Sequence, residues 1–414
     1  MQRSVNRSSR MKTRRYDLVV LGGGFAGVAA AVQGARDGLR VAILERTTLW
    51  GGLATSGLVT IYMPLDNGLG RQVSFGLAEE LLYRTLRYGP GTIPAPWINP
   101  RFAEGIADLA ADNASGRYMT RFAAHACVLA MDEILTEVGA DLWVDTLACL
   151  PVRDGRRIEA VEVENKSGRT RLEAAFFIDA TGDADIAFRA GVPCREHRRR
   201  PCLLALLADL DHVKAAAAAE DLTGLFGGGS FGDNEHDVGY DGDCPPLFGG
   251  NGREFSRFVL ESRRYARGKI AARQRELGEK GRKRHYPALT ATLPDIRMTR
   301  DIEGVETIEA DMKNRRVDTS VGMIADNRQR DAVWEVPYGA LVGRDVDNLY
   351  VVGRCASATG YAWQVSRLIQ AVVVTGQAGA AAAALCIRKG TTAHGIDVRD
   401  VQARLEGLGF ELHL

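Results

Sequence analysis

The sequence predicts an α/β protein, with a parallel sheet whose strands are joined by helices and with an inserted α+β segment. The first observation is a strand, a helix and a second strand within residues 16–45, the order from which parallel sheets are built. The second is the return of apolar, strand-like patterns at 333–336 and 349–352. The third is a change of composition over 195–294, where glycine and charged residues interrupt the alternation.

Composition limits the classes of function. The chain has 414 residues with 53 basic and 52 acidic side chains, which gives a net charge of +1. Proteins that bind nucleic acid usually carry a clear basic excess, so a nucleic-acid partner is not expected. The 46 glycines are about 11% of the chain, against an average of roughly 7%. Glycine in this excess indicates tight turns and a backbone that closely approaches a large ligand.

A glycine motif follows the first predicted strand, Tyr16–Leu21. Gly22, Gly24 and Gly27 have the spacing GxGxxG, and an alanine-rich helix follows them. The first glycine makes the turn, the second lets the backbone approach a pyrophosphate, and the third allows close packing of helix on strand. The helix N-terminus then faces the phosphates, where its dipole favours negative charge. Glu45 ends the second strand and can accept hydrogen bonds from a ribose, so the motif predicts a dinucleotide site.

Residues 227–232 match the same spacing but lack its context. No strand is predicted before them, and Asp233, Asn234 and Glu235 do not begin an apolar helix. We therefore expect a loop there and a single dinucleotide site in the chain. A pyridine-nucleotide:disulfide reductase needs a second nucleotide domain and a redox cysteine pair, and the sequence shows neither.

The remaining elements define a split domain with an insert. In chain order we expect helices and loops over 58–125, a helix over 122–138, a strand over 140–144, a small β-meander over 148–174, a buried strand with a glycine turn over 176–183, a long charged helix over 255–280 and a last helix to Ala384. The expected domains are a disordered leader at 1–15, a dinucleotide-binding domain in two parts at 16–194 and 295–395, an inserted substrate domain at 195–294 and a C-terminal segment at 396–414.

The cysteines and apolar stretches indicate a cytoplasmic protein. The seven cysteines include no CxxC pair, which argues against a disulfide framework and a zinc ribbon. The longest apolar run, 371–387, is alanine-rich and interrupted by glycine and polar residues, so we expect a buried helix and not a membrane span. The basic residues 1–15 have some features of a targeting signal, but the apolar stretch after them is the first strand of the domain.

Several stretches together resemble the FAD-dependent oxidoreductase family with a flavin domain of the glutathione-reductase type. In the family's order they are residues 16–27, 45–46, 50–55, 165–183, 336–341, 347–355 and 376–379. The resemblance covers most of the chain outside the insert. It implies a Rossmann-like FAD-binding domain, made of a parallel sheet plus a β-meander, with an inserted α+β substrate domain and with FAD as the cofactor.

The resemblance also assigns cofactor contacts. It places the pyrophosphate on the glycine motif, the adenosine ribose on Glu45 and the ribityl chain and flavin along 51–55. Residues 353–357 would lead into the C-terminal helix, whose N-terminus faces the flavin and stabilises negative charge on it. The expected cofactor-binding residues are Gly22, Gly24, Phe25, Ala26, Gly27, Glu45, Arg46, Gly51, Gly52, Leu53, Ala54, Thr55, Ala180, Thr181, Gly182, Gly353, Arg354 and Ser357.

The sequence departs from the family pattern after Gly353-Arg354-Cys355. The family continues Ser-Ala-Thr-His-Glu-Ala, whereas this chain has Gly360 and Tyr361 at the His and Glu positions. If that His is a base or a substrate ligand, this protein uses another group or another substrate. Tyr361, Trp363 and Gln364 are then candidates to line a more aromatic catalytic pocket. The alternative is that they pack at the start of the helix.

Three further catalytic candidates lie where the insert rejoins the domain. His285 is a candidate general base near neutral pH, with a surface histidine as the alternative. Arg297 and Arg300 share a face if they are helical, and two guanidiniums can hold a carboxylate; the alternative is salt bridging between domains. The acidic residues of 233–243 fit no calcium loop, so we expect a solvated loop and no metal.

The function expected from these observations is hydride transfer between a small organic substrate and N5 of FAD. Two alternatives stay open, a flavoprotein without redox activity and a flavin monooxygenase. Gly353-Arg354 argues against the monooxygenase, because aromatic hydroxylases have Gly-Asp in this piece. The expected partner is a small-molecule substrate, with no nucleic acid and no membrane, and the sequence leaves a homo-oligomer open.

Overall fold

A seven-stranded sheet forms the centre of the computed structural model, which describes residues 11–111, 117–233 and 239–414. The strand order is β7-β2-β1-β10-β9-β8, and β20 also pairs with β10. Parallel pairing joins β1 (Lys12–Leu21), β2 (Val41–Leu44), β7 (Asp141–Trp143), β10 (Gly168–Asp179) and β20 (Leu349–Val351). The predicted α/β class with a parallel sheet is therefore confirmed.

The β-meander is continuous with this sheet. Strand β8 (Leu147–Asp154) pairs antiparallel with β9 (Arg157–Asn165), which pairs antiparallel with the first half of β10. The second half of β10 lies between β1 and β20 in parallel pairing. One long strand thus carries both parts of the architecture, which explains why an apolar, buried-strand pattern directly follows the meander in the sequence.

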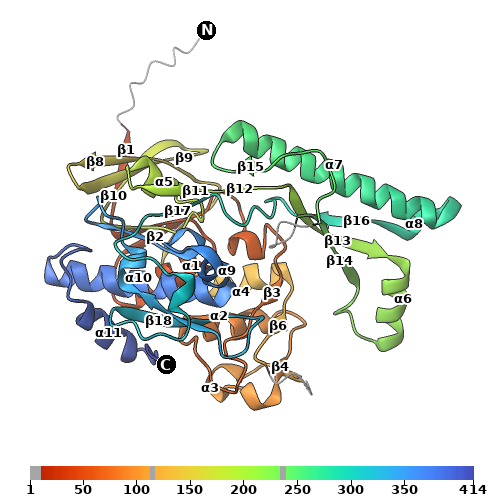
Figure 1. Ribbon diagram of the computed structural model, residues 1–414, viewed down its shortest axis with the longest axis horizontal. Helices are drawn as coiled ribbons and strands as arrows, with labels where there is room; N and C mark the ends of the chain where they lie inside the picture. Colours follow the sequence, from red (N-terminus) through yellow and green to blue (C-terminus); the bar gives the residue numbers. More distant parts are fainter. Residues whose placement is uncertain (1–10, 112–116, 234–238) are drawn as a thin grey trace, which may run out of the picture.

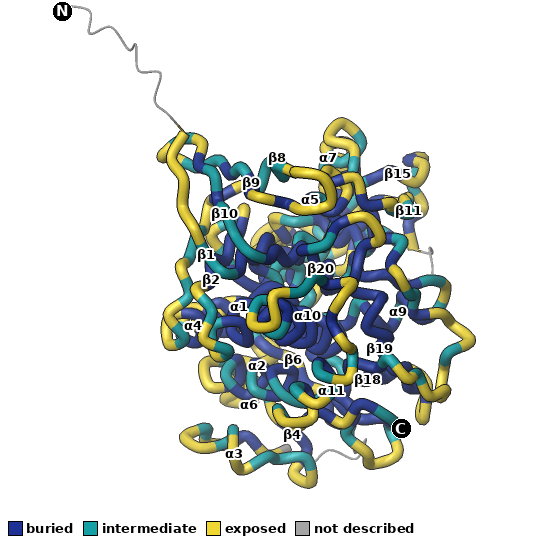
Figure 2. The backbone as a smooth tube through the Cα atoms, turned by 90° about the vertical axis from the view of Figure 1, so that its left-hand side faces the viewer, coloured by how far each residue is buried: buried dark blue, intermediate teal, exposed yellow. Residues whose placement is uncertain are grey.

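Alternate side chains of β1 pack against different layers. Leu18 and Val20 face helices α1 (Phe25–Arg36), α2 (Leu77–Leu86), α4 (Ala124–Glu137) and α10 (Ile369–Lys389). Val19 and Leu21 face the meander and α5 (Asp185–Arg189). Figure 2 shows α1 and α10 buried at the centre of the molecule. Helix α10 is the one described helix long and apolar enough to cross a membrane, and 94% of its apolar stretch is buried inside the protein, as expected for a core helix.

Shorter elements complete the body of the molecule. The strands are β3 (Ile61–Tyr62), β4 (Ile93–Pro94), β5 (Ala110–Ala111), β6 (Thr120–Arg121), β18 (Ser320–Ala325) and β19 (Val333–Pro337). The helices are α3 (Pro100–Ala103), α9 (Gly360–Ser366) and α11 (Val398–Glu406). The C-terminal tail packs on the β18–β19 hairpin, where Glu335 accepts from the Leu414 N–H and pairs with His413.

The insert projects from the body as an arm on the right of Figure 1. Its core is a three-stranded antiparallel sheet in the order β14-β13-β16, made of β13 (Cys202–Asp209), β14 (Phe226–Gly232) and β16 (His285–Thr290). Helices α6 (Leu210–Ala219), α7 (Gly252–Glu276) and α8 (Gly281–Arg284) accompany it. A small ladder of β11 (Cys194–Glu196) with β17 (Arg300–Ile302) lies where the insert leaves and rejoins the body, and a second ladder, β12 (Arg198–Arg199) with β15 (Leu247–Phe248), lies within the insert.

Two local expectations were wrong. Residues 12–15 belong to β1 and not to a disordered leader, because their backbone pairs with residues 170–173 of β10 and Arg15 forms an ion pair with Glu173; residues 1–10 lie outside the described part of the chain. Residues 227–232 form most of strand β14 and not a loop. Their backbone pairs with β13, and the missing side chain at Gly227 leaves room for the His212 ring.

Candidate functional site

A cavity lies at the carboxyl ends of β1, β2, β10 and β20, the edge at which parallel sheets bind ligands. Its volume is about 350 Å³, which falls within the roughly 300–1,000 Å³ of small-molecule sites. Segments that follow these strands line one part of it. The other part is lined by residues 293–297 at the end of the insert, by Asn327 and Arg328, and by Arg367 to Ile369 at the start of α10.

The glycine motif has the steric properties of a phosphate cradle. A Cβ on Gly24 would meet only the Cα of Gly52, at 4.0 Å, so the space beside it is open. A Cβ on Gly27 would lie 1.8 Å from the carbonyl oxygen of Gly22, so this glycine is needed where helix and strand pack. Within the described chain no side chain caps α1, and its first N–H groups are therefore available to a ligand.

Glu45 is fixed at the edge of the cavity. Its carboxylate is 6% exposed and accepts hydrogen bonds from the backbone N–H groups of Gly23, at 2.9 Å, and Thr47, at 2.8 Å. A carboxylate has about four acceptor positions. Glu45 can therefore keep both backbone bonds and accept from a ligand hydroxyl at the same time.

An ion pair between Asp183 and Arg354 stands beside the glycine turn at Gly182. The Arg354 guanidinium donates to Asp183 at 2.6 Å, and the Thr299 hydroxyl donates to the same oxygen at 2.6 Å. Burial alone would raise the pKa of Asp183, but Arg354 and Thr299 outweigh it and hold this pKa below its usual value. Asp183 is therefore an anion that orients Arg354 in the cavity wall.

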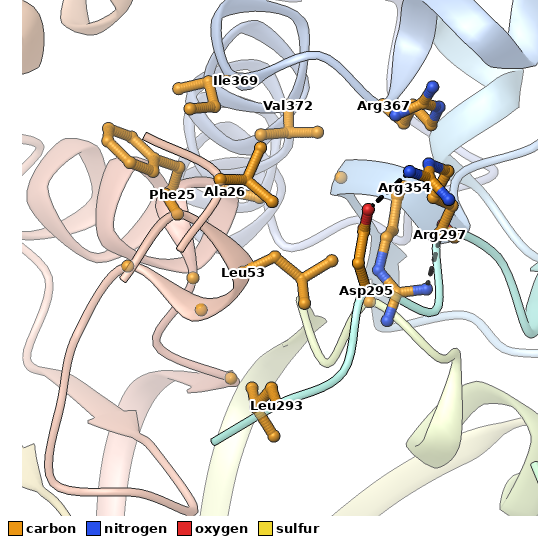
Figure 3. Close-up of a pocket in the computed structure, with 18 of the residues that line it drawn as sticks. Phe25, Ala26, Leu53, Leu293, Asp295, Arg297, Arg354, Arg367, Ile369 and Val372 are labelled. Carbon is orange, nitrogen blue, oxygen red and sulfur yellow. Dashed lines mark hydrogen bonds and ion pairs between the residues drawn. The ribbon is translucent and has the colours of Figure 1, made fainter. Parts of the chain in front are cut away.

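Arg297 is the second oriented guanidinium of the cavity. It forms an ion pair with Asp295 at 2.7 Å, and both residues line the cavity. The neighbouring Cys202 thiol lies 3.9 Å from Asp295, and burial raises its pKa to about 12, so it stays protonated. In Figure 3, Arg297, Arg354 and Arg367 lie on one side of the view, opposite apolar side chains that include Phe25.

A model of the FAD dependent oxidoreductase family matches residues 17–220 and 233–405. The chain belongs to this family. It is thus an oxidoreductase enzyme, and its cofactor is FAD. The open space at Gly24, the uncapped N-terminus of α1 and the free acceptor positions of Glu45 fit a dinucleotide with its pyrophosphate on the glycine motif.

Individual relatives are more distant. A thioredoxin reductase of Ureaplasma parvum is 36% identical over 72 residues, which are 17% of this chain and 23% of that protein. Similar solved structures include a geranylgeranyl bacteriochlorophyll reductase-like protein from Thermoplasma acidophilum, at 13% identity and a TM-score of 0.48, covering 96% of this chain and 83% of that one. Another is a p-nitrophenol 4-monooxygenase from Pseudomonas putida, at 14% identity and a TM-score of 0.46, covering 95% and 84%.

The oxidoreductase places most of the predicted cofactor residues in the cavity wall. Gly22, Gly24, Phe25, Ala26, Glu45, Arg46, Gly51 to Ala54, Ala180 to Gly182, Gly353 and Arg354 line it. Three do not. Gly27 packs on Gly22, the Thr55 hydroxyl donates to the Trp50 carbonyl, and the buried Ser357 hydroxyl contacts Arg195 and Thr307.

The three catalytic candidates on α9 do not line the cavity. The Tyr361 hydroxyl donates to Asp326 at 2.6 Å, and Trp363 is 3% exposed. Their contacts lead to residues that do line it: Arg328 lies over the Tyr361 ring, and Arg367 lies over the Trp363 ring and donates to Gln364. Packing at the start of the helix therefore describes α9, and its side chains contact Arg328 and Arg367 of the cavity wall.

His285 and Arg300 are also away from the cavity. His285 begins β16 in the arm, is 7% exposed and pairs with Asp209 at 2.9 Å. Arg300 pairs with Asp185 and Glu196, which is the salt-bridge alternative. Neither residue lines the cavity, so the structure does not place them with the other candidate site residues.

Sequence reasoning missed several residues of the wall. Most of them come from segments that are distant in the chain from the glycine motif. They are Val59, Ile61, Met63, Asp183, Leu204, Phe255, residues 293–296, Asn327, Arg328, Val352, Arg367 to Ile369 and Val372. No local motif marks most of them; Asp183 and Val352 lie within stretches that resemble the family and could have been found by position.

No group of three or more metal-binding side chains occurs in the described ranges. In the acidic stretch, Asp241 forms an ion pair with Lys269, and the backbone carbonyl of Asp233 accepts from Arg297. Residues 234–238 of this stretch lie outside the described residues.

Asp185 makes stability depend on pH. Burial, and then the neighbouring Asp183, raise its pKa from 3.8 to about 6. The folded state therefore holds this proton more tightly than the unfolded state does, so its contribution to stability is present below about pH 4 and is lost as the pH rises to 6. In Asp185→Asn, the decrease in the free energy of unfolding between low and neutral pH should be smaller by up to about 3 kcal/mol. Urea unfolding of both proteins at pH 4 and pH 7 measures it; an unchanged pH dependence in the variant would contradict the assignment.

Proposed function

We propose that this oxidoreductase transfers hydride between a small organic substrate and N5 of FAD, with the substrate held between the flavin domain and the insert. The observation that carries the proposal is the extent of the cavity. It continues from the dinucleotide cradle to Leu204 and Phe255 of the insert and to residues 293–297. A site for the cofactor alone would need no wall from the insert.

When bound, FAD supplies a two-electron redox centre, and the protein supplies binding, orientation and charge. The N-terminus of α1 and the Arg354 guanidinium, oriented by Asp183, favour the negative pyrophosphate. The N-terminus of α10 meets the cavity at Leu368 and Ile369, and its dipole favours negative charge there.

The wall beyond the cradle has an apolar and a charged part. Leu204, Phe255 and Leu293 exclude water from the substrate end, and water exclusion strengthens electrostatic interactions in the cavity. Arg297, fixed by Asp295, offers a planar donor group to an anionic or carbonyl substrate. These groups bind and orient; the redox change belongs to the cofactor.

Thiol–disulfide chemistry is not part of the proposal. None of the seven cysteines is in a disulfide. Burial raises the pKa of Cys127, Cys194 and Cys202 to about 12, and the thiolate is the reactive form. The reduced cysteines and the near-zero net charge also support a cytoplasmic protein that acts on a small molecule and binds neither nucleic acid nor membrane.

Anaerobic photoreduction of the purified holoenzyme, followed by an oxygen pulse, tests the proposal. We expect the flavin absorbance to bleach and then to return. A flavin that neither reductants nor acceptors affect would identify a non-redox flavoprotein and refute hydride transfer. An oxygenated product formed from a bleaching substrate would instead identify a monooxygenase. Screening small organic compounds for anaerobic bleaching then identifies the substrate.

A further inference from the structure

One face of the arm's three-stranded sheet is largely exposed in the described part of the chain. In the antiparallel register, Leu206 of β13 lies opposite Gly228 of β14 and Leu289 of β16, and residues directly opposite each other share a face. The side chains on this face alternate with those that pack on α7. We name it the open face; its residues are Leu204, Leu206, Ala208, Phe226, Gly228, Ser230, Tyr286 and Leu289.

Most of the open face is apolar and exposed, whereas Leu204 and Leu206 are half-buried and Ala208 is buried. Tyr286 is 49% exposed, Phe226 45% and Leu289 37%. Gly228 and Ser230 are also exposed, and a Cβ on Gly228 would meet no atom within 4 Å. On the opposite face, Leu203 and Ala205 are buried in a cluster that includes Ala266 and Ile270 of α7, and Leu204 and Leu206 of the open face pack against this cluster in part. An apolar sheet face that stays in water costs free energy unless something binds to it.

The open face is continuous with the cavity. Leu204 belongs to both, and Leu206 follows it two residues along the same strand. The chain that leaves β16 after Thr290 passes directly to Leu293 and Pro294, which also line the cavity. Figure 3 shows Leu293 at the end of the cavity away from Arg354 and Arg367. The surface therefore begins inside the substrate end of the site and runs outward.

The dimensions favour an extended chain molecule over a second protein. The eight residues of β13 span about 26 Å, and three strands are about 10 Å wide between the outer backbones, which gives roughly 260 Å². Each partner of a stable protein interface contributes about 800 Å². A strip of this shape matches an aliphatic chain lying along the strands.

We propose that the substrate carries a long aliphatic chain, which lies on the open face while its reacting end occupies the cavity. The inference rests on the proposed function, because it takes the cavity as the site of the chemistry. The reacting end lies near Leu293 and Arg297, and the chain passes Leu204 and Leu206. Gly228 and Ser230 leave the space that a larger side chain would fill.

Binding of 1-alkanols from butanol to dodecanol to the holoenzyme, measured by calorimetry, tests the proposal. Each methylene that reaches the open face should tighten binding by up to about fourfold. In Gly228→Phe the new ring fills the strip, so the gain from the longer alkanols should be lost while butanol binds as before. Gly268→Phe is the matched control, since a Cβ there also meets no atom within 4 Å but lies on helix α7.

The inference would be overturned if alkanol affinity did not rise with chain length, or if it rose equally in Gly228→Phe and in the unchanged protein. It would also be overturned if Gly228→Phe sedimented as a smaller species than the unchanged protein, which would assign the open face to a second copy of the chain. Reduction and reoxidation of the same samples separate this from the proposed function. Failure to cycle refutes hydride transfer, whereas loss of the chain-length effect in a cycling enzyme refutes only the long-chain substrate.

Discussion

Gly24→Val is expected to give a folded protein that has lost most of its FAD. Gly24 has φ −69° and ψ 177°, which any residue adopts, and a Cβ there would approach only Gly52, at 4.0 Å. The new side chain therefore fills the cradle and not the protein core. Overpacking of this kind costs about 1–3 kcal/mol, so FAD affinity should fall by on the order of 10- to 100-fold. Flavin absorbance per polypeptide, after dialysis, measures the loss.

Gly27→Val provides the contrasting variant three residues away. Its Cβ would lie 1.8 Å from the Gly22 carbonyl oxygen, so helix α1 could not pack on β1 and the protein should fail to fold. Thermal unfolding followed by circular dichroism distinguishes the two variants. Undiminished FAD content in folded Gly24→Val protein would refute the assigned pyrophosphate site.

This contrast shows how much of the cofactor site the sequence could predict. The motif at Gly22, Gly24 and Gly27 constrains the backbone locally, and local constraints are visible in a single sequence. The same holds for Glu45, because a strand that ends beside the motif places its last residue at the same edge. These residues lie where they were expected.

The substrate side could not be predicted in the same way. Leu204, Arg328 and Arg367 come from three elements that are distant in the chain, and only tertiary packing brings them to one cavity. The strand at 227–232 was missed because glycine has a low strand propensity, whereas pairing with β13 and packing under His212 decide the structure. The position of the candidates on α9 could not be predicted for a related reason, since tertiary packing places Arg328 over the Tyr361 ring and Arg367 over the Trp363 ring.

Arg300→Leu is expected to lower stability without changing the redox behaviour of the flavin. Arg300 is 5% exposed, pairs with Asp185 at 3.3 Å and donates to the Gly250 carbonyl at 3.1 Å. Its guanidinium carbon lies 4.1 Å from the ring centroid of Phe188 and 5.0 Å from that of Phe248. Asp185 is 30% exposed, so the pair is only half-buried; loss of a hydrogen bond to a charged group costs about 1.5–3 kcal/mol, and the free energy of unfolding should fall by about that amount.

The backbone between Arg297 and Arg300 explains why Arg300 should affect stability and not the flavin. The spacing of three would place both on one face of a helix, but β17 begins at Arg300, and only Arg297 points into the cavity. Arg300 instead connects α5 of the flavin domain with the insert at Phe248 and Gly250. Arg300→Lys keeps the charge but not the planar contact with the two rings, so it should recover part of the stability. If Arg300→Leu changed the flavin midpoint potential or the substrate affinity and left stability unchanged, Arg300 would be a catalytic residue. We expect lower stability and unchanged redox behaviour, because the guanidinium is enclosed by Phe188, Phe248 and Asp185.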